Sequence, residues 1–145
     1  MLYINLVATP GVRRFMQAAA DAGADAVLIP DLPTSMREAG LHLVAIVPPN
    51  ASDERVARIA GLTSGYTYLL SRVGITSTDH ASGTPAERII RDLERAKAPP
   101  ALLGFGISTP EHVRRALEAG AAGVIVGSAL VKIVSEHLGD RDAML

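Results

Sequence analysis

Two glycine-rich segments of this sequence are well suited to bind an anionic ligand. The first is Gly104-Phe105-Gly106-Ile107-Ser108, which follows a short apolar run, and the second is Gly127-Ser128, which follows the next such run. Backbone N–H groups can bind an anion where no Cβ blocks its approach, and the N-terminus of a helix adds unpaired N–H groups and partial positive charge. A single segment could simply end a strand, but two in successive units favour a phosphate site.

The overall composition limits the kinds of partner. The chain has 145 residues, a net charge of −1, no cysteine and 3% aromatic residues, so we expect neither a disulfide or thiolate site nor nucleic-acid binding. No apolar run reaches the roughly 18 residues of a membrane helix, and no stretch reads as a signal peptide, which indicates a cytoplasmic protein. The four histidines lack ligand-like spacing, so we expect no metal.

Short apolar runs rich in β-branched residues alternate with helix-like segments rich in Ala, Arg and Glu. Runs that are apolar throughout suit strands buried on both faces of a parallel sheet. The expected strands are Tyr3–Val7, Ala26–Ile29, Leu43–Val47, Thr67–Leu70, Ala101–Gly104 and Gly123–Val126. The expected helices are Val12–Ala22, Asp53–Ala60, Pro85–Ala96, Pro110–Ala119, and a last one that starts near Gly127-Ser128 and runs toward His137. We expect Ser52, Thr84 and Ser108-Thr109 to begin the second, third and fourth of these helices, and Gly23, Gly61 and Gly120 to end the first, second and fourth.

This alternation predicts an α/β protein, and it is compatible with either a doubly wound sheet or a (β/α)8 barrel. A phosphate site made by the loops after the last two strands is typical of the barrel. We therefore predict part of a TIM (β/α)8 barrel, with residues 1–145 forming one incomplete domain.

A larger set of motifs resembles the tryptophan synthase α chain family. The most specific motif is Gly-Tyr-Thr-Tyr-Leu-Leu-Ser-Arg at residues 65–72. The other motifs follow in family order: Pro30-Asp31-Leu32-Pro33, Pro48-Pro49-Asn50, Gly74-Ile75-Thr76, Gly104-Phe105-Gly106-Ile107-Ser108 and the segment from Ala121 to Ala129. The resemblance covers nearly the whole chain and implies strands 4 to 8 of the barrel with their helices, without the N-terminal βα units and the end of the last helix.

The family is a lyase of tryptophan biosynthesis that cleaves indole-3-glycerol phosphate to indole and glyceraldehyde 3-phosphate, without a cofactor or metal. It works with a β chain in an αββα complex. The resemblance implies that the backbone of Gly106, Gly127 and Ser128 holds the substrate phosphate. It also implies that Phe105 flanks the indole ring, that Tyr68 lines the pocket near the reacting carbons, and that Leu28 packs near the indole.

Further roles follow from the same resemblance. The segment Arg72–Pro85 matches a lid that closes over the substrate, in which Thr76 supports the catalytic acid. Ser77 stands where the family usually has Gly, and a left-handed backbone there would cost about 1 kcal/mol, which predicts weaker phosphate binding. Three residues, Asn5, Pro33 and Asn50, fall on the side that faces the β chain.

The catalytic groups of the family are a Glu and an Asp near the ends of the second and third strands. Both positions would precede Met1, so no catalytic residue is assigned, and Asp31 is interpreted as structural. We expect the chain to be inactive alone. One alternative is a non-catalytic fragment that binds a phosphate ligand and docks on the β chain, and another is a different phosphate-binding barrel enzyme, an isomerase or epimerase. The segment Pro33–Leu43 is short for a full turn–helix–turn and leaves room for a helix of little more than one turn at Met36–Ala39. We expect either poor packing of this βα unit or an internal deletion.

Overall fold

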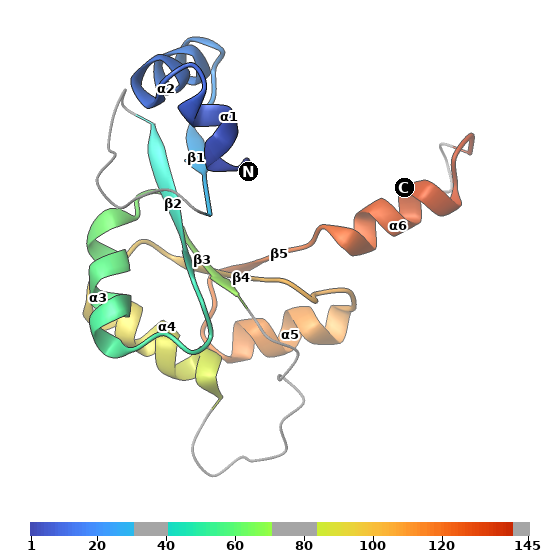
Figure 1. Cartoon of the computed structure of the whole chain (residues 1–145). Coiled ribbons are helices and arrows are strands. Elements are labelled where there is room, and N and C mark those ends of the chain that lie inside the picture. The colour runs from blue at the N-terminus through green and yellow to red at the C-terminus, as the bar shows by residue number, and fades with distance from the viewer. Residues whose placement is uncertain (31–40, 71–83, 141–145) are drawn as a thin grey trace.

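The computed structural model describes residues 1–30, 41–70 and 84–140 of the chain. Five strands and six helices lie in these residues (Figure 1). In chain order they are α1 (Ile4–Ala8), α2 (Val12–Asp21), β1 (Ala26–Leu28), β2 (His42–Val47), α3 (Asp53–Leu62), β3 (Thr67–Leu70), α4 (Pro85–Arg95), β4 (Ala101–Gly104), α5 (Pro110–Glu118), β5 (Gly123–Ile125) and α6 (Ser128–Glu136).

The strands form one parallel sheet in the order β1-β2-β3-β4-β5, so every neighbour in the sheet is also the next strand in the sequence. This confirms the predicted α/β class and five of the six predicted strands. A doubly wound sheet reverses its strand order at a switch point, whereas a barrel adds each strand beside the last. The observed order is that of a barrel.

The sixth predicted strand, Tyr3–Val7, is wrong, because residues Ile4–Ala8 form the helix α1. A short apolar run is compatible with either structure, and burial decides between them. The spacing of Ile4 and Val7 suits one face of a helical turn, and both pack in a cluster with Met16 of α2 and Val27 of β1. The N–H of Leu2 donates to the Leu28 carbonyl at 3.1 Å.

The helix boundaries follow the expected capping chemistry. The side chains of Ser52, Thr84 and Thr109 accept hydrogen bonds from the backbone N–H three residues later and so begin α3, α4 and α5. Gly23 and Gly120 have φ of 85° and 95° after α2 and α5, the left-handed conformation that ends a helix. Gly61 does not end a helix as predicted, since α3 continues to Leu62. The expected short helix Met36–Ala39 lies outside the described residues.

The main core lies between the sheet and the helices α3, α4 and α5. Alternate residues of β2, β3 and β4 point toward these helices, as Val47, Leu69 and Leu103 do. The helix side chains that meet them are Val56, Ile59, Ile89, Ile90, Leu93 and Ala116. The intervening residues of the strands, such as Ile46, Tyr68 and Leu102, therefore face the opposite side, which is the interior of a barrel.

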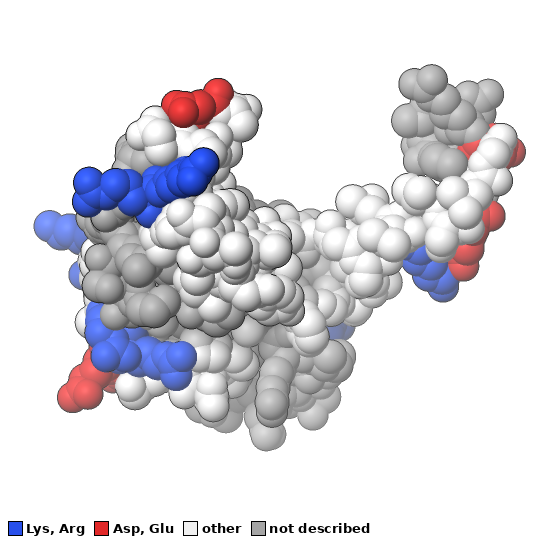
Figure 2. Space-filling model, turned by 45° about the horizontal axis from the view of Figure 1, so that its top comes forward, with Lys and Arg blue, Asp and Glu red and all other residues white. Residues whose placement is uncertain are grey.

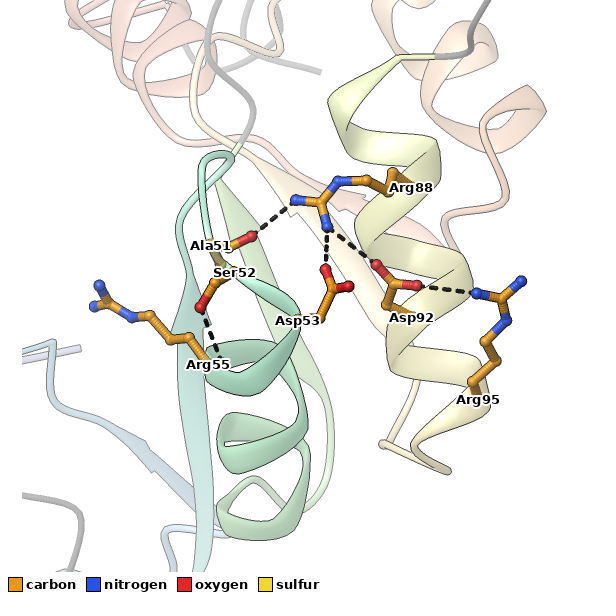
Figure 3. A network of polar contacts seen from close by, with 7 residues as sticks. All are labelled: Ala51, Ser52, Asp53, Arg55, Arg88, Asp92 and Arg95. Atoms are coloured by element: carbon orange, nitrogen blue, oxygen red, sulfur yellow. Dashed lines mark hydrogen bonds and ion pairs between the residues drawn. The ribbon is translucent and has the colours of Figure 1, made fainter.

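Arg88 joins α4 to the beginning of α3 (Figure 3). Its Nη1 donates to Asp53 Oδ1 at 2.8 Å and to Asp92 Oδ2 at 3.1 Å, and its Nη2 donates to the carbonyl of the buried Ala51 at 2.8 Å. Asp92 also pairs with Arg95 at 3.3 Å. Because Ala51 precedes α3, this network fixes the chain after β2 against the first turns of α4.

The last helix, α6, has no buried residue. Leu130, Val131, Ile133 and Val134 are all exposed large apolar residues along it. Figure 2 shows α6 projecting from the body of the molecule, with mostly uncharged surface in view. Within the described residues, no helix is long and apolar enough to cross a membrane.

Candidate functional site

The two glycine-rich segments predicted to bind phosphate lie beside each other at the carboxyl edge of the sheet. Strands β4 and β5 are paired with Gly104 opposite Ile125. Gly106 and Gly127 each stand two residues beyond this pair, so the parallel register brings the two segments to the same place. Such an edge, after the last strands, is where barrel enzymes hold phosphate groups.

The segment after β4 has an unusual backbone. Phe105 has φ of 73° and Gly106 has φ of 84°, so two successive residues are left-handed. Glycine adopts this conformation readily, whereas a bulky side chain such as that of Phe does so only when its surroundings impose it. Ile107 is buried in the main core directly afterwards and anchors the turn.

The segment after β5 leaves the start of α6 open. The helices α3, α4 and α5 begin with a side-chain cap, but Gly127 at the N-cap of α6 supplies none, and Ser128 is exposed. A Cβ built on Gly127 would have no heavy atom within 4 Å. No side chain caps the first turn of α6, and the space beside the Gly127 Cα leaves room for an anion to approach the backbone.

Tyr68 lies on the barrel-interior face and covers Gly104. A Cβ at position 104 would stand 2.5 Å from the Tyr68 Oη and 2.6 Å from its Cζ, so the glycine makes room for the ring. Burial raises the pKa of the Tyr68 phenol above its usual value of 10.0, and the nearby Tyr66 adds to the increase. At neutral pH the phenol is therefore a hydrogen-bond donor beside the segment after β4.

The other predicted site residues divide into three groups. Leu28 is buried on β1, on the same face of the sheet as Tyr68, whereas the Phe105 side chain is 66% exposed. Asn5 on α1 and Asn50 after β2 are exposed, as a partner contact requires. The remaining predicted residues, Pro33, Arg72, Thr76 and Ser77, lie outside the described residues.

The acidic residues of the described part lie away from the barrel-interior face. None of the five strands carries Asp or Glu, and Asp53, Asp92 and Glu111 are paired with arginines. No three potential metal ligands come together in the described residues. In the view of Figure 2, the Lys and Arg side chains lie in several patches that are apart from one another.

Two surface hollows in the described residues lie away from the candidate site. One of about 680 Å³ lies along the start of α2, beside Arg13, Arg14 and Gln17. The other, of about 150 Å³, lies between β2 and α3, beside Arg55 and Arg58. Neither of these hollows is lined by the residues predicted to bind substrate, so the candidate site is defined by the two loops and Tyr68.

Sequence reasoning missed His112, which contacts the segment after β4. The N–H of Ser108 donates to His112 Nδ1 at 3.3 Å. The spacing of four residues around the predicted N-cap offered a signal, since a side chain in the first turn often reaches back to the N–H groups before a helix. The contact of Arg88 with Asp53 had no such signal, because the two residues are 35 positions apart.

A parallel sheet built in sequence order, with two glycine-rich loops after its last strands, defines part of a (β/α)8-barrel protein. The family model described as "Tryptophan synthase alpha chain" matches residues 1–145. The chain is 48% identical to the tryptophan synthase alpha chains of Photobacterium profundum and Vibrio vulnificus, over its whole length and 57% of each of those proteins. We conclude that the chain belongs to the tryptophan synthase alpha chain family of tryptophan biosynthesis.

Solved structures agree with this assignment. The structure of the tryptophan synthase α2β2 complex from Pyrococcus furiosus matches with a TM-score of 0.78 and 35% identity, over 98% of this chain and 58% of that one. The α subunit from the same organism matches with a TM-score of 0.77 and 37% identity, over 98% and 59%. The chain thus spans a little under three fifths of the length of the relatives it matches.

The comparison also shows a difference in length. The 145 residues of this chain align with 153 residues of the Photobacterium protein, a difference of 153 − 145 = 8. At least eight positions of that relative therefore have no counterpart in this chain.

Proposed function

We propose that this chain, as one incomplete (β/α)8-barrel domain, provides the phosphate-binding and indole-facing part of a lyase site for indole-3-glycerol phosphate. Gly106, Gly127 and Ser128 bind the phosphate through backbone N–H groups, and Tyr68, Leu28 and Phe105 face the indole and glycerol carbons. No cofactor or metal takes part, and the protein acts in the cytoplasm. The open N-terminus of α6 beside the segment after β4 is the observation that carries this proposal.

Substitution of Gly127 by Ala tests the phosphate site with little risk to the fold. Gly127 has φ of −117° and open space around its Cβ direction, so Ala fits the unliganded protein. An anion held by the backbone would meet the new methyl group. We expect Gly127→Ala to weaken binding of indole-3-glycerol phosphate about tenfold, as measured by calorimetry, at an unchanged melting temperature.

Gly61→Ala is the matched control. Gly61 is also open around its Cβ direction, but it lies in α3, away from the carboxyl edge of β4 and β5. This variant should bind like the unsubstituted chain. Equal affinity of the Gly127 and Gly61 variants, or no detectable binding by the unsubstituted chain, would refute the phosphate role.

Catalysis by the family requires a proton donor and a base, and the described strands offer no carboxylate for either role. We propose that the 145-residue chain does not cleave indole-3-glycerol phosphate alone and gains activity when joined to the first three βα units of a family member. Indole release is the measurement. Turnover by the purified chain that disappears in a Tyr68→Leu variant would show that the chain is itself catalytic.

The partner is proposed to be a tryptophan synthase β chain in an αββα complex. The solved Pyrococcus furiosus relative is an α2β2 complex, and Asn5 and Asn50 are exposed in this chain. We expect Asn50→Arg to weaken association with a β chain in sedimentation experiments. Binding to the β chain without lyase activity is the second candidate function, which the absence of strand carboxylates favours for this chain. Family membership disfavours an isomerase or epimerase.

A further inference from the structure

We propose that His112 is a positioning residue that holds the segment after β4, residues 104–108, in the conformation needed to bind an anion. Three observations support this role. The backbone of the segment is strained, Ser108 at its end contacts the His112 side chain on α5, and the N-cap of α5 is formed by Thr109 without the imidazole. The expected effect on phosphate binding rests on the function proposed above, whereas the expected effect on the conformation of residues 104–108 does not.

The backbone of the segment needs a restraint at each end. Its left-handed residues, Phe105 and Gly106, follow a paired strand residue, Gly104, which fixes the first end. Left-handed conformation in a bulky residue is strained, so it persists only where neighbouring contacts impose it. At the second end, Ile107 is buried, and Ser108 is exposed and turns toward α5.

His112 supplies the restraint at that second end. Its Nδ1 accepts from the Ser108 N–H at 3.3 Å and lies 3.5 Å from the Ser108 Oγ. The backbone N–H of His112 has a different partner, because it donates to Oγ1 of the N-cap residue Thr109 at 3.2 Å. Thr109 therefore caps α5, and the His112 imidazole does not take part in this cap. The imidazole instead contacts Ser108, which precedes the helix.

The chemistry of this contact restricts what can replace His112. Nδ1 accepts a hydrogen bond only when it carries no proton, so the imidazole in this contact is the neutral form protonated on Nε2. A Gln side chain has a carbonyl oxygen that can accept from the same N–H, whereas Leu has a similar bulk and no acceptor. Gln and Leu at position 112 thus separate the role of the acceptor from that of packing.

The test is amide hydrogen exchange of the unliganded 145-residue chain, followed by titration with inorganic phosphate. We expect His112→Leu to speed exchange of the Ser108 amide about fivefold and to weaken phosphate binding by a similar factor, the effect of one lost hydrogen bond. His112→Gln should restore both. His137→Leu is the matched control, because the His137 Nδ1 contacts the Ile133 carbonyl at 2.8 Å at the far end of α6.

The two readouts separate the possible failures. Unchanged exchange at Ser108 in His112→Leu, or no recovery with Gln, would overturn the positioning role. Faster exchange in His112→Leu with recovery in Gln, but no phosphate binding by the unsubstituted chain, would support the positioning role and reject the proposed phosphate site. A comparable effect of His137→Leu on Ser108 would also overturn the inference.

Discussion

Tyr68 and Gly104 are matched at the level of single atoms. They lie on neighbouring strands, β3 and β4, and the phenol ring occupies the space that a Cβ at position 104 would need. Large side chains are accommodated in a sheet interior when a small residue stands beside them. The large side chain of Tyr68 therefore requires a glycine at position 104.

We predict that Gly104→Ala lowers the free energy of unfolding by about 1–3 kcal/mol, the usual cost of overpacking. The added methyl group would lie 2.6 Å from the Tyr68 Cζ, so the whole ring must move rather than the hydroxyl alone. Urea denaturation measures the change. The double variant Gly104→Ala with Tyr68→Leu should recover part of the loss, and strictly additive effects of the two substitutions would contradict this packing.

The raised pKa of Tyr68 predicts a change of stability with pH. The folded protein keeps the phenol proton to higher pH than the unfolded chain, so above about pH 10 the unfolded state binds fewer protons. The contribution of this group is complete below the unfolded pKa and is lost as pH rises through the folded one. Tyr68→Phe should therefore show a shallower alkaline loss of stability in denaturation experiments at several pH values.

Tyr3→Phe is the control for this experiment, because Tyr3 is 67% exposed. Its pH dependence should follow that of the unsubstituted chain. The same alkaline slope in the Tyr68→Phe variant as in the Tyr3→Phe variant would show that folding does not raise the pKa of Tyr68.

At the residue scale, the positions of the candidate site residues at the strand ends were predictable from the sequence, whereas their contacts were not. The glycines after β4 and β5 were found because strand order places them at one edge. The dependence of Gly104 on Tyr68 and of Ser108 on His112 was not found, because such contacts follow from strand register and side-chain direction, which no local pattern specifies.

Helices and strands were predictable where the local signals and the packing agree. The caps at Ser52 and Thr84 and the glycine stops at Gly23 and Gly120 identified boundaries correctly. The segment Tyr3–Val7 was predicted as a strand because its apolar residues fit both patterns. Its structure depends on Met16 and Val27, distant residues that bury one side of a helical turn.

The connection between α3 and α4 through Arg88 can be tested by substitution. We predict that Arg88→Ala lowers the free energy of unfolding by about 1 kcal/mol, chiefly because the buried Ala51 carbonyl loses a charged donor. The pair with Asp53 adds little, since the Asp53 side chain is 87% exposed, and Asp92 keeps its pair with Arg95 in the variant. Thermal or urea denaturation gives the measurement.

Arg95→Ala separates this effect from the loss of a surface charge. The Arg95 side chain is 78% exposed and pairs with Asp92 at 3.3 Å, so its removal should change stability by no more than about 0.5 kcal/mol. Added salt should weaken the Arg88 effect only in part, because the hydrogen bond to the Ala51 carbonyl does not depend on a second charge. Equal losses in the two variants would argue against a specific role of Arg88.

On the scale of the whole molecule, the apolar side chains of α6 form an exposed surface that the described core does not cover. We predict that the chain associates as its concentration rises, and that Val131→Glu with Val134→Glu reduces this association in light-scattering experiments. The stability of the folded core should change by no more than about 0.5 kcal/mol, since neither residue is buried.

Leu93→Ala provides the contrast, because Leu93 is fully buried on α4 and its truncation should cost about 2–5 kcal/mol. A large loss of stability in the α6 double variant would mean that α6 packs on the core in solution. Unchanged association in that variant would mean that another surface, such as the edge of β1 or β5, is responsible.

The strand order has a consequence for synthesis on the ribosome. Since β1 to β5 are neighbours in the order of translation, each strand that emerges finds its partner already made and closes a loop of only one βα unit. The nascent chain never has to leave a strand unpaired while it waits for a distant segment, so the sheet can grow stepwise from its N-terminal side. Stalled chains released after β3 or β4 should therefore already protect β2 from proteases.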